Sequence, residues 1–148
     1  MKYLALIIVV LLMTLRGAGQ DLSAQDVPEK VRKAFEARYP DTYVYEWEYK
    51  RKSGFYEAEF MYRGVKHEAC FTREGLWIST EKELKISELP KAVSEGLVKT
   101  RYGDWKIDEV KEHQSGSSSL VYEIEVKQGK KEVDLFFLPD GSLLRVEK

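Results

Sequence analysis

The sequence predicts an α+β protein of two tandem units, each one helix followed by a four-stranded antiparallel sheet, with the helices packed on one sheet face. Three observations support this fold class. The chain repeats itself, each copy opens with helical periodicity, and glycine turns then recur about every ten residues. We expect the first repeat over residues 27–80 and the second over residues 89–148, with their strands joined edge to edge because joining would protect two sheet edges.

The duplication is seen when the chain is aligned with itself. Residues 27–35 (VPEKVRKAF) align with residues 89–97 (LPKAVSEGL), and residues 56–60 (YEAEF) align with residues 122–126 (YEIEV). Two copies of a unit of about 60 residues explain both matches.

Each copy is expected to begin with an amphipathic helix. In the first copy, Pro28 stands where a missing N–H costs little, and Val31 and Phe35 recur at helical spacing. The second helix is predicted from about Pro90 to Tyr102. Both helices should lie on a sheet.

The strands that follow should form hairpins with one apolar and one wet face. Tyr56, Ala58 and Phe60 alternate with Glu57 and Glu59, so the apolar side chains should face the helix. Glycines mark the turns at positions 54, 64, 75, 116, 129 and 141.

The segment YVYEWEY, residues 43–49, departs from simple alternation. In the alignment of the two copies only Val44 and Trp47 stay apolar, where they match Ile107 and Val110. Apolar positions three apart cannot share one face of a regular strand. We therefore predict a bulge or a twist between Val44 and Trp47, and again between Ile107 and Val110.

Four aromatic side chains are candidate binding residues. Tyr43, Tyr45 and Tyr49 align with charged residues in the second copy, so the fold does not require them and they could form a contact surface. Half-buried packing on the sheet is the alternative, because tyrosine is common on strands. Trp77 matches the apolar Leu143 and is either a core side chain or an exposed interface anchor.

The first 20 residues predict a secretory signal peptide. Lys2 precedes an apolar run over residues 3–15, and cleavage is expected between about residues 19 and 24. A retained anchor is the alternative, but the run is shorter than the roughly 20 apolar residues that span a bilayer. We expect a periplasmic or secreted protein with no membrane insertion after cleavage.

Charge and composition restrict the partners. Removal of residues 1–20 takes away Lys2 and Arg16 and no acid, which leaves 22 basic and 25 acidic side chains and a net charge of −3. Nucleic acid is not an expected partner, because phosphate binding needs a basic footprint.

The titratable residues predict no catalytic site, no metal site and no cofactor. His67 and Cys70 lie three apart on one predicted strand, so they should point to opposite faces, and Cys70 is expected to be a small buried or half-buried residue. Two histidines and one cysteine lack the usual spacing of zinc ligands. Calcium is an alternative, because the acidic sheet face could gather carboxylates from Glu46, Glu48, Glu57 and Glu59.

Several motifs occur together along the chain, namely VPEKVRKAFEARYPD, YEWEY, GFYEAEF, EGLWIST and LPKAV. In this combination, which covers nearly all of the mature chain, the sequence resembles the PepSY-like, beta-lactamase-inhibitor-like proteins exported by Gram-negative bacteria. The resemblance implies an α+β fold of tandem helix-plus-sheet units outside the cytoplasm, and it supplies no catalytic residues. Fold analogy with inhibitory propeptides does not fix function.

Together these observations predict a non-enzymatic exported binding module, an inhibitor or regulator of a periplasmic or secreted protein, which binds through its exposed sheet face. A calcium or small-ligand sensor that uses the acidic sheet face is the alternative.

Overall fold

The computed structural model describes residues 19–116 and 120–148. The predicted signal peptide lies outside the described residues except for Gly19 and Gln20. The elements are β1 (Gln20–Leu22), α2 (Glu29–Arg38), β2 (Val44–Lys50), β3 (Phe55–Tyr62), β4 (Val65–Phe71), β5 (Trp77–Glu83), η1 (Ile86–Glu88), α3 (Lys91–Val98), β6 (Lys106–Ser115), β7 (Leu120–Gln128), β8 (Lys131–Phe137) and β9 (Leu143–Glu147).

The predicted architecture of two tandem helix-plus-four-strand units is wrong. The described strands are hydrogen-bonded into one nine-stranded antiparallel sheet in chain order, β1 to β9, and β1 is a strand that the sequence pattern did not indicate. The expectation that the strands join into one sheet is confirmed. Sequence repetition shows which local elements recur, but it does not limit hydrogen bonding, because any unpaired strand edge offers donors and acceptors to a neighbouring strand.

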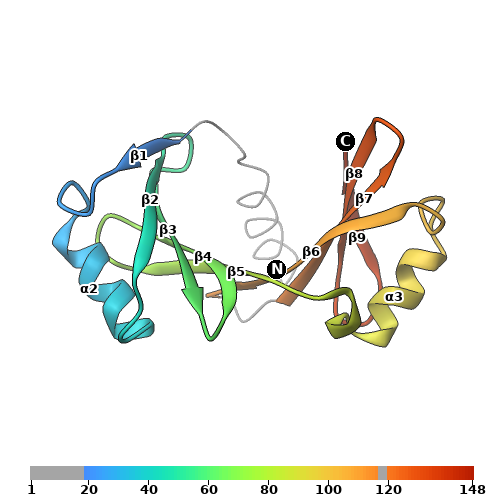
Figure 1. Ribbon diagram of the computed structural model, residues 1–148, viewed down its shortest axis with the longest axis horizontal. Helices are drawn as coiled ribbons and strands as arrows, with labels where there is room; N and C mark the ends of the chain where they lie inside the picture. The colour runs from blue at the N-terminus through green and yellow to red at the C-terminus, as the bar shows by residue number, and fades with distance from the viewer. Residues whose placement is uncertain (1–18, 117–119) are drawn as a thin grey trace, which may run out of the picture. The chain divides into compact units, whose positions relative to one another are not determined.

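The described residues fall into two compact units. Unit 1 comprises residues 19–81 and 115–116, and unit 2 comprises residues 82–114 and 120–148. In each unit the helix lies against the strands of that unit (Figure 1). Each helix begins directly after a proline, Pro28 or Pro90, whose backbone is extended (φ −53° and −55°).

The core of unit 1 is aromatic. Phe35 of α2 contacts the rings of Trp47, Phe60 and Phe71, at centroid distances of 5.7, 4.8 and 6.4 Å with tilts of 72° to 83°. Edge-to-face contacts of this kind add to the stability from burial. Ala58 and Phe60 are fully buried against α2, so the predicted apolar face of β3 is confirmed.

The core of unit 2 is mainly aliphatic. Val93 and Leu97 of α3 pack on the apolar face of β6–β8, where Ile124, Val126 and Leu135 are fully buried. The α3 helix also approaches the β8–β9 turn closely. A Cβ on Gly141, whose φ is +84°, would lie 2.1 Å from the Ala92 carbonyl oxygen, so this position accepts only glycine.

The α3 helix ends earlier than predicted. It stops at Val98 rather than near Tyr102, because the Thr100 hydroxyl donates to the Leu97 carbonyl oxygen at 2.8 Å and accepts from the Tyr102 N–H at 3.1 Å. Both contacts replace helical hydrogen bonds with a turn. The residues after Val98 therefore leave the helix and face β9.

Both predicted bulges are confirmed. The pairing of β2 with β3 shifts between Val44 and Glu46, and that of β6 with β7 shifts between Ile107 and Glu109. Each shift returns the next apolar side chain to the helix side, so Trp47 and Val110 are both buried.

Candidate functional site

The side of the unit 1 strands that faces away from α2 carries most of the predicted functional residues. We call it the open face of unit 1. In the register of β2–β4, Glu48 pairs with Glu57 and Glu57 with Cys70. The next row places Glu59 between Glu46 and Glu68. Directly paired residues share a face, so these side chains lie together.

Two lysines pair with carboxylates of this acidic surface. The Lys50 ammonium lies 2.5 Å from a Glu48 oxygen and 2.7 Å from a Glu57 oxygen. The Lys66 ammonium lies 3.3 Å from Glu59 and 3.2 Å from Glu68. Of the four carboxylates that the sequence suggested for calcium, those of Glu48, Glu57 and Glu59 are therefore bound by protein cations. No cluster of three or more metal-binding side chains occurs in residues 19–116 and 120–148.

Burial perturbs the ionisation of Glu57. Desolvation raises the pKa of its carboxyl from 4.5 to about 7, against the opposing effect of the Lys50 ammonium. The expectation of a wet face is wrong at Glu57, Glu123 and Glu125, which are buried. Long neighbouring side chains such as Lys50 and Lys127 cover these carboxylates, and alternation in the sequence does not report that cover.

Cys70 and His67 do not form a catalytic pair. His67 pairs with Phe60 on the helix side, where the two rings stack at 5.5 Å, whereas Cys70 pairs with Glu57 on the open face. The Cys70 thiol donates to a Glu57 oxygen at 3.4 Å, and burial with the nearby Glu57 and Glu81 carboxylates raises its pKa. A thiol with a raised pKa is a poor nucleophile.

The second histidine is buried in unit 2. The Nε2 atom of His113 lies 2.7 Å from a Glu123 oxygen, on the side of the strands opposite α3. In the same region the Arg145 guanidinium lies 3.9 Å from the centre of the buried Phe136 ring. These contacts place His113 within the packing of unit 2, whereas Cys70 belongs to unit 1.

The three candidate tyrosines do not form one stripe. Tyr43 is 81% exposed just before β2, and Tyr45 is 44% exposed, with its hydroxyl 3.4 Å from Glu59 on the open face. Tyr49 lies on the helix side and packs on Tyr56 with ring centroids 5.0 Å apart. The bulge in β2 separates the side chains that simple alternation placed together.

Trp77 is held within unit 1. Its indole N–H donates to the Thr80 hydroxyl at 2.9 Å, and the Arg38 guanidinium covers one ring face at 3.6 Å from the centroid. The same Thr80 hydroxyl lies 2.6 Å from that of Tyr39. Trp77 is half-buried, so these contacts support a structural role better than a free interface anchor.

The fold and its open face define a small helix-and-sheet protein in which His67 and Cys70 lie on opposite sides of β4. No helix among them is long and apolar enough to cross a membrane. A family profile described as "Putative beta-lactamase-inhibitor-like, PepSY-like" matches residues 13–63 and 54–145. The chain belongs to this family, which confirms the resemblance stated above.

Solved structures show the same fold. A BLIP-like protein from Bacteroides fragilis NCTC 9343 is 31% identical, with a TM-score of 0.70 over 81% of this chain and 85% of that chain. A protein from Bacteroides eggerthii DSM 20697, described among "putative periplasmic proteins", is 22% identical, with a TM-score of 0.76 over 82% of this chain and 88% of that chain. None of the curated proteins compared matches the chain.

Proposed function

We propose that this protein is a non-enzymatic exported module that binds a periplasmic or secreted protein and inhibits or regulates it, and that the open face of unit 1 makes the contact. One observation carries the proposal: the rings of Tyr43 and Tyr45 are exposed at the start of β2, beside this face. Exposed aromatic side chains supply large contact area at low entropic cost and dominate many interfaces.

The surroundings of these rings support binding of a protein. Lys50 and Lys66 each hold two of the neighbouring carboxylates, so a partner meets a fixed set of hydrogen-bonding groups that keeps some net negative charge. An inhibitory role is supported by the family description and by the BLIP-like relative. The predicted signal peptide and the similar periplasmic protein support the location.

The first experiment identifies the partner in its own compartment. A photoreactive amino acid at position 43 of the exported full chain should cross-link one protein, whereas the same group at the exposed Glu74 should not. Purified beta-lactamases are the first partners to titrate, with hydrolysis of a chromogenic cephalosporin as the measurement. Equal cross-linking from the two positions contradicts the proposed surface.

The second experiment measures the contribution of the rings. With the cross-linked partner, the Tyr43→Ala/Tyr45→Ala variant should bind at least about thirtyfold more weakly, the loss typical of interface hot spots. Tyr49→Ala is the matched control, because it removes a tyrosine that packs on Tyr56 instead. Unchanged affinity in the double variant refutes the role of the open face.

A further inference from the structure

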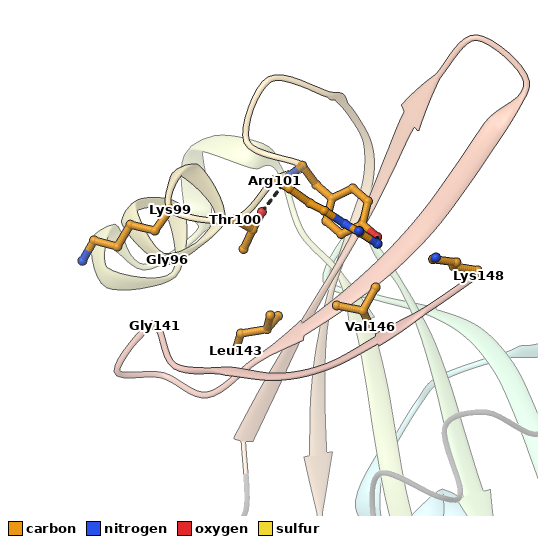
Figure 2. A pocket seen from close by; sticks show the side chains of 9 residues that line it. Gly96, Lys99, Thr100, Arg101, Gly141, Leu143, Val146 and Lys148 are labelled. Carbon is orange, nitrogen blue, oxygen red and sulfur yellow. Dashed lines mark hydrogen bonds between the residues drawn. The ribbon is translucent and has the colours of Figure 1, made fainter.

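A groove in unit 2 lies between the end of α3 and strand β9. It encloses about 880 Å³. Leu143 and Val146 of β9 and the ring of Tyr102 form an apolar part of its lining, and Lys99, Arg101 and Lys148 supply its charges. Figure 2 shows Leu143 and Val146 below the segment that carries Thr100 and Arg101, with Lys99 and Lys148 at opposite ends of the view.

A second cavity of about 570 Å³ adjoins the first and shares Arg101, Tyr102 and Lys148 with it. It adds Lys131, the first residue of β8, and Lys130 just before it. We call the two cavities together the basic groove. The positive charges come from segments far apart in sequence, so a local run of basic residues does not predict the groove.

The cations of the basic groove differ from Lys50, Lys66 and Lys127. Lys50, Lys66 and Lys127 each bind two or three carboxylates. In contrast, no ion pair with another described residue engages the cations of the groove, which are Lys99, Arg101, Lys130, Lys131 and Lys148. The one acidic side chain in the lining, Glu132, lies 3.2 Å from Lys127. A protein of net charge −1 thus gathers uncompensated positive charge here.

The position of β9 makes the groove suitable for an extended chain. Among the described strands, β9 is the last in the sheet and pairs only with β8, so one of its edges has no strand partner. An unpaired edge can accept the backbone of another chain, and side chains that alternate toward the groove can enter its cavities. Strand β9 has five residues, which span about 17 Å of extended chain.

The shape of the groove is fixed by the fold. A Cβ on Gly96 would lie 2.3 Å from the Gly141 carbonyl oxygen, so α3 and the β8–β9 turn are in direct backbone contact. The Arg101 guanidinium donates to the Tyr102 hydroxyl at 2.6 Å and lies 4.8 Å from the centre of that ring. A charge held in this way is already oriented, which lowers the entropy lost on binding.

We propose that the basic groove binds an extended acidic segment of a partner protein, which adds alongside β9. Apolar side chains of the segment contact Leu143 and Val146, and its carboxylates pair with the groove cations. Positive potential steers such a partner and selects acidic sequences. This site is separate from the open face of unit 1, and its test does not require the function proposed above.

The test uses the full mature chain and two blocked fluorescent peptides of seven residues. One peptide alternates glutamate with valine, and its counterpart carries lysine in place of glutamate. Fluorescence polarisation should show binding of the glutamate peptide alone. Binding should weaken as NaCl rises to about 0.5 M, because salt screens exposed charges. Equal binding of the two peptides, or of neither, overturns the proposal.

Matched charge variants locate the binding. The Lys99→Glu/Arg101→Glu variant should bind the glutamate peptide about tenfold more weakly. This is the effect of removing two exposed ion pairs and adding two like-charge repulsions. Lys52→Glu/Arg73→Glu makes the same charge change in exposed turns of unit 1 and should leave the affinity within about twofold. Equal losses in both variants overturn the proposal, because they would report net charge alone.

A third variant and a second ligand complete the test. The Leu143→Ala variant keeps every charge and should bind the glutamate peptide several-fold more weakly. This result would separate the contribution of apolar contact from that of electrostatic attraction. Vesicles of phosphatidylglycerol in phosphatidylcholine test a membrane as the acidic partner. Binding to these vesicles with no binding of the glutamate peptide assigns the groove to a lipid surface and overturns the proposal.

Discussion

Replacing Glu57 by glutamine tests whether the open face of unit 1 holds a destabilising buried carboxyl. Glu57 is buried between β2 and β4, with the Lys50 ammonium 2.7 Å from one oxygen and the Cys70 thiol 3.4 Å from the other. Desolvation is the largest influence and raises the pKa of the carboxyl to about 7. Glutamine has nearly the same shape and no charge to desolvate.

The sign and size of the effect follow from this pKa. Unfolded Glu57 ionises near pH 4.5, whereas in the folded protein it keeps its proton up to about pH 7. Folding therefore takes up a proton between these pH values, and the free energy of unfolding falls as the pH rises through this window. At about 1.4 kcal/mol per pKa unit, the loss that belongs to Glu57 is roughly 3 kcal/mol and is complete above the folded pKa.

The assay is urea unfolding of the wild type and Glu57→Gln at a series of pH values on both sides of this window, followed by tryptophan fluorescence. As the pH rises through the window, the free energy of unfolding of the wild type should fall by roughly 3 kcal/mol relative to that of Glu57→Gln. Glu59→Gln, on the same strand and face but less buried, is the matched control. Parallel pH curves for the wild type and Glu57→Gln would refute the reasoning.

Two further predictions concern the backbone and the thiol. Gly141→Ala should lower the free energy of unfolding by roughly 3 kcal/mol, because it adds contact with the Ala92 carbonyl to the strain of a positive φ, whereas Gly129→Ala, with positive φ and open space, should lower it by about 1 kcal/mol. Similar losses in the two variants, measured by urea unfolding, would show that the close contact is unimportant. Cys70 should react with iodoacetamide much more slowly in the folded protein than in urea at the same pH, because burial and the Glu57 carboxylate raise the pKa of its thiol. Equal rates, followed by mass spectrometry, would contradict this placement.

The candidate site was only partly predictable from the sequence. The exposure of Tyr43 and Tyr45 agrees with the argument that the fold does not need them. The separate placement of Tyr49 depends on the bulge after Val44. The sequence pattern predicted this bulge, but it did not predict which side of the sheet each tyrosine ring would occupy. Which lysine neutralises which carboxylate depends on strand register, because Lys50 meets Glu57 only across β2 and β3.

The sequence by itself determined the local structure and the family. Prolines at positions 28 and 90 set the helix starts, and alternation set the buried face of β3. These features depend on near neighbours along the chain, and a pattern of side chains records them directly. The same local motifs carried the resemblance that the family match confirms.

Only the tertiary structure decided which strands pair with one another and where charged side chains come together. It joined nine strands into one sheet, added β1, and brought Lys99, Arg101 and Lys131 beside β9 while burying Glu57 beneath Lys50. Each outcome depends on which distant backbone edges and side chains meet in space. Spacing along the chain does not encode these meetings, because they follow from the free energy of the whole packed arrangement.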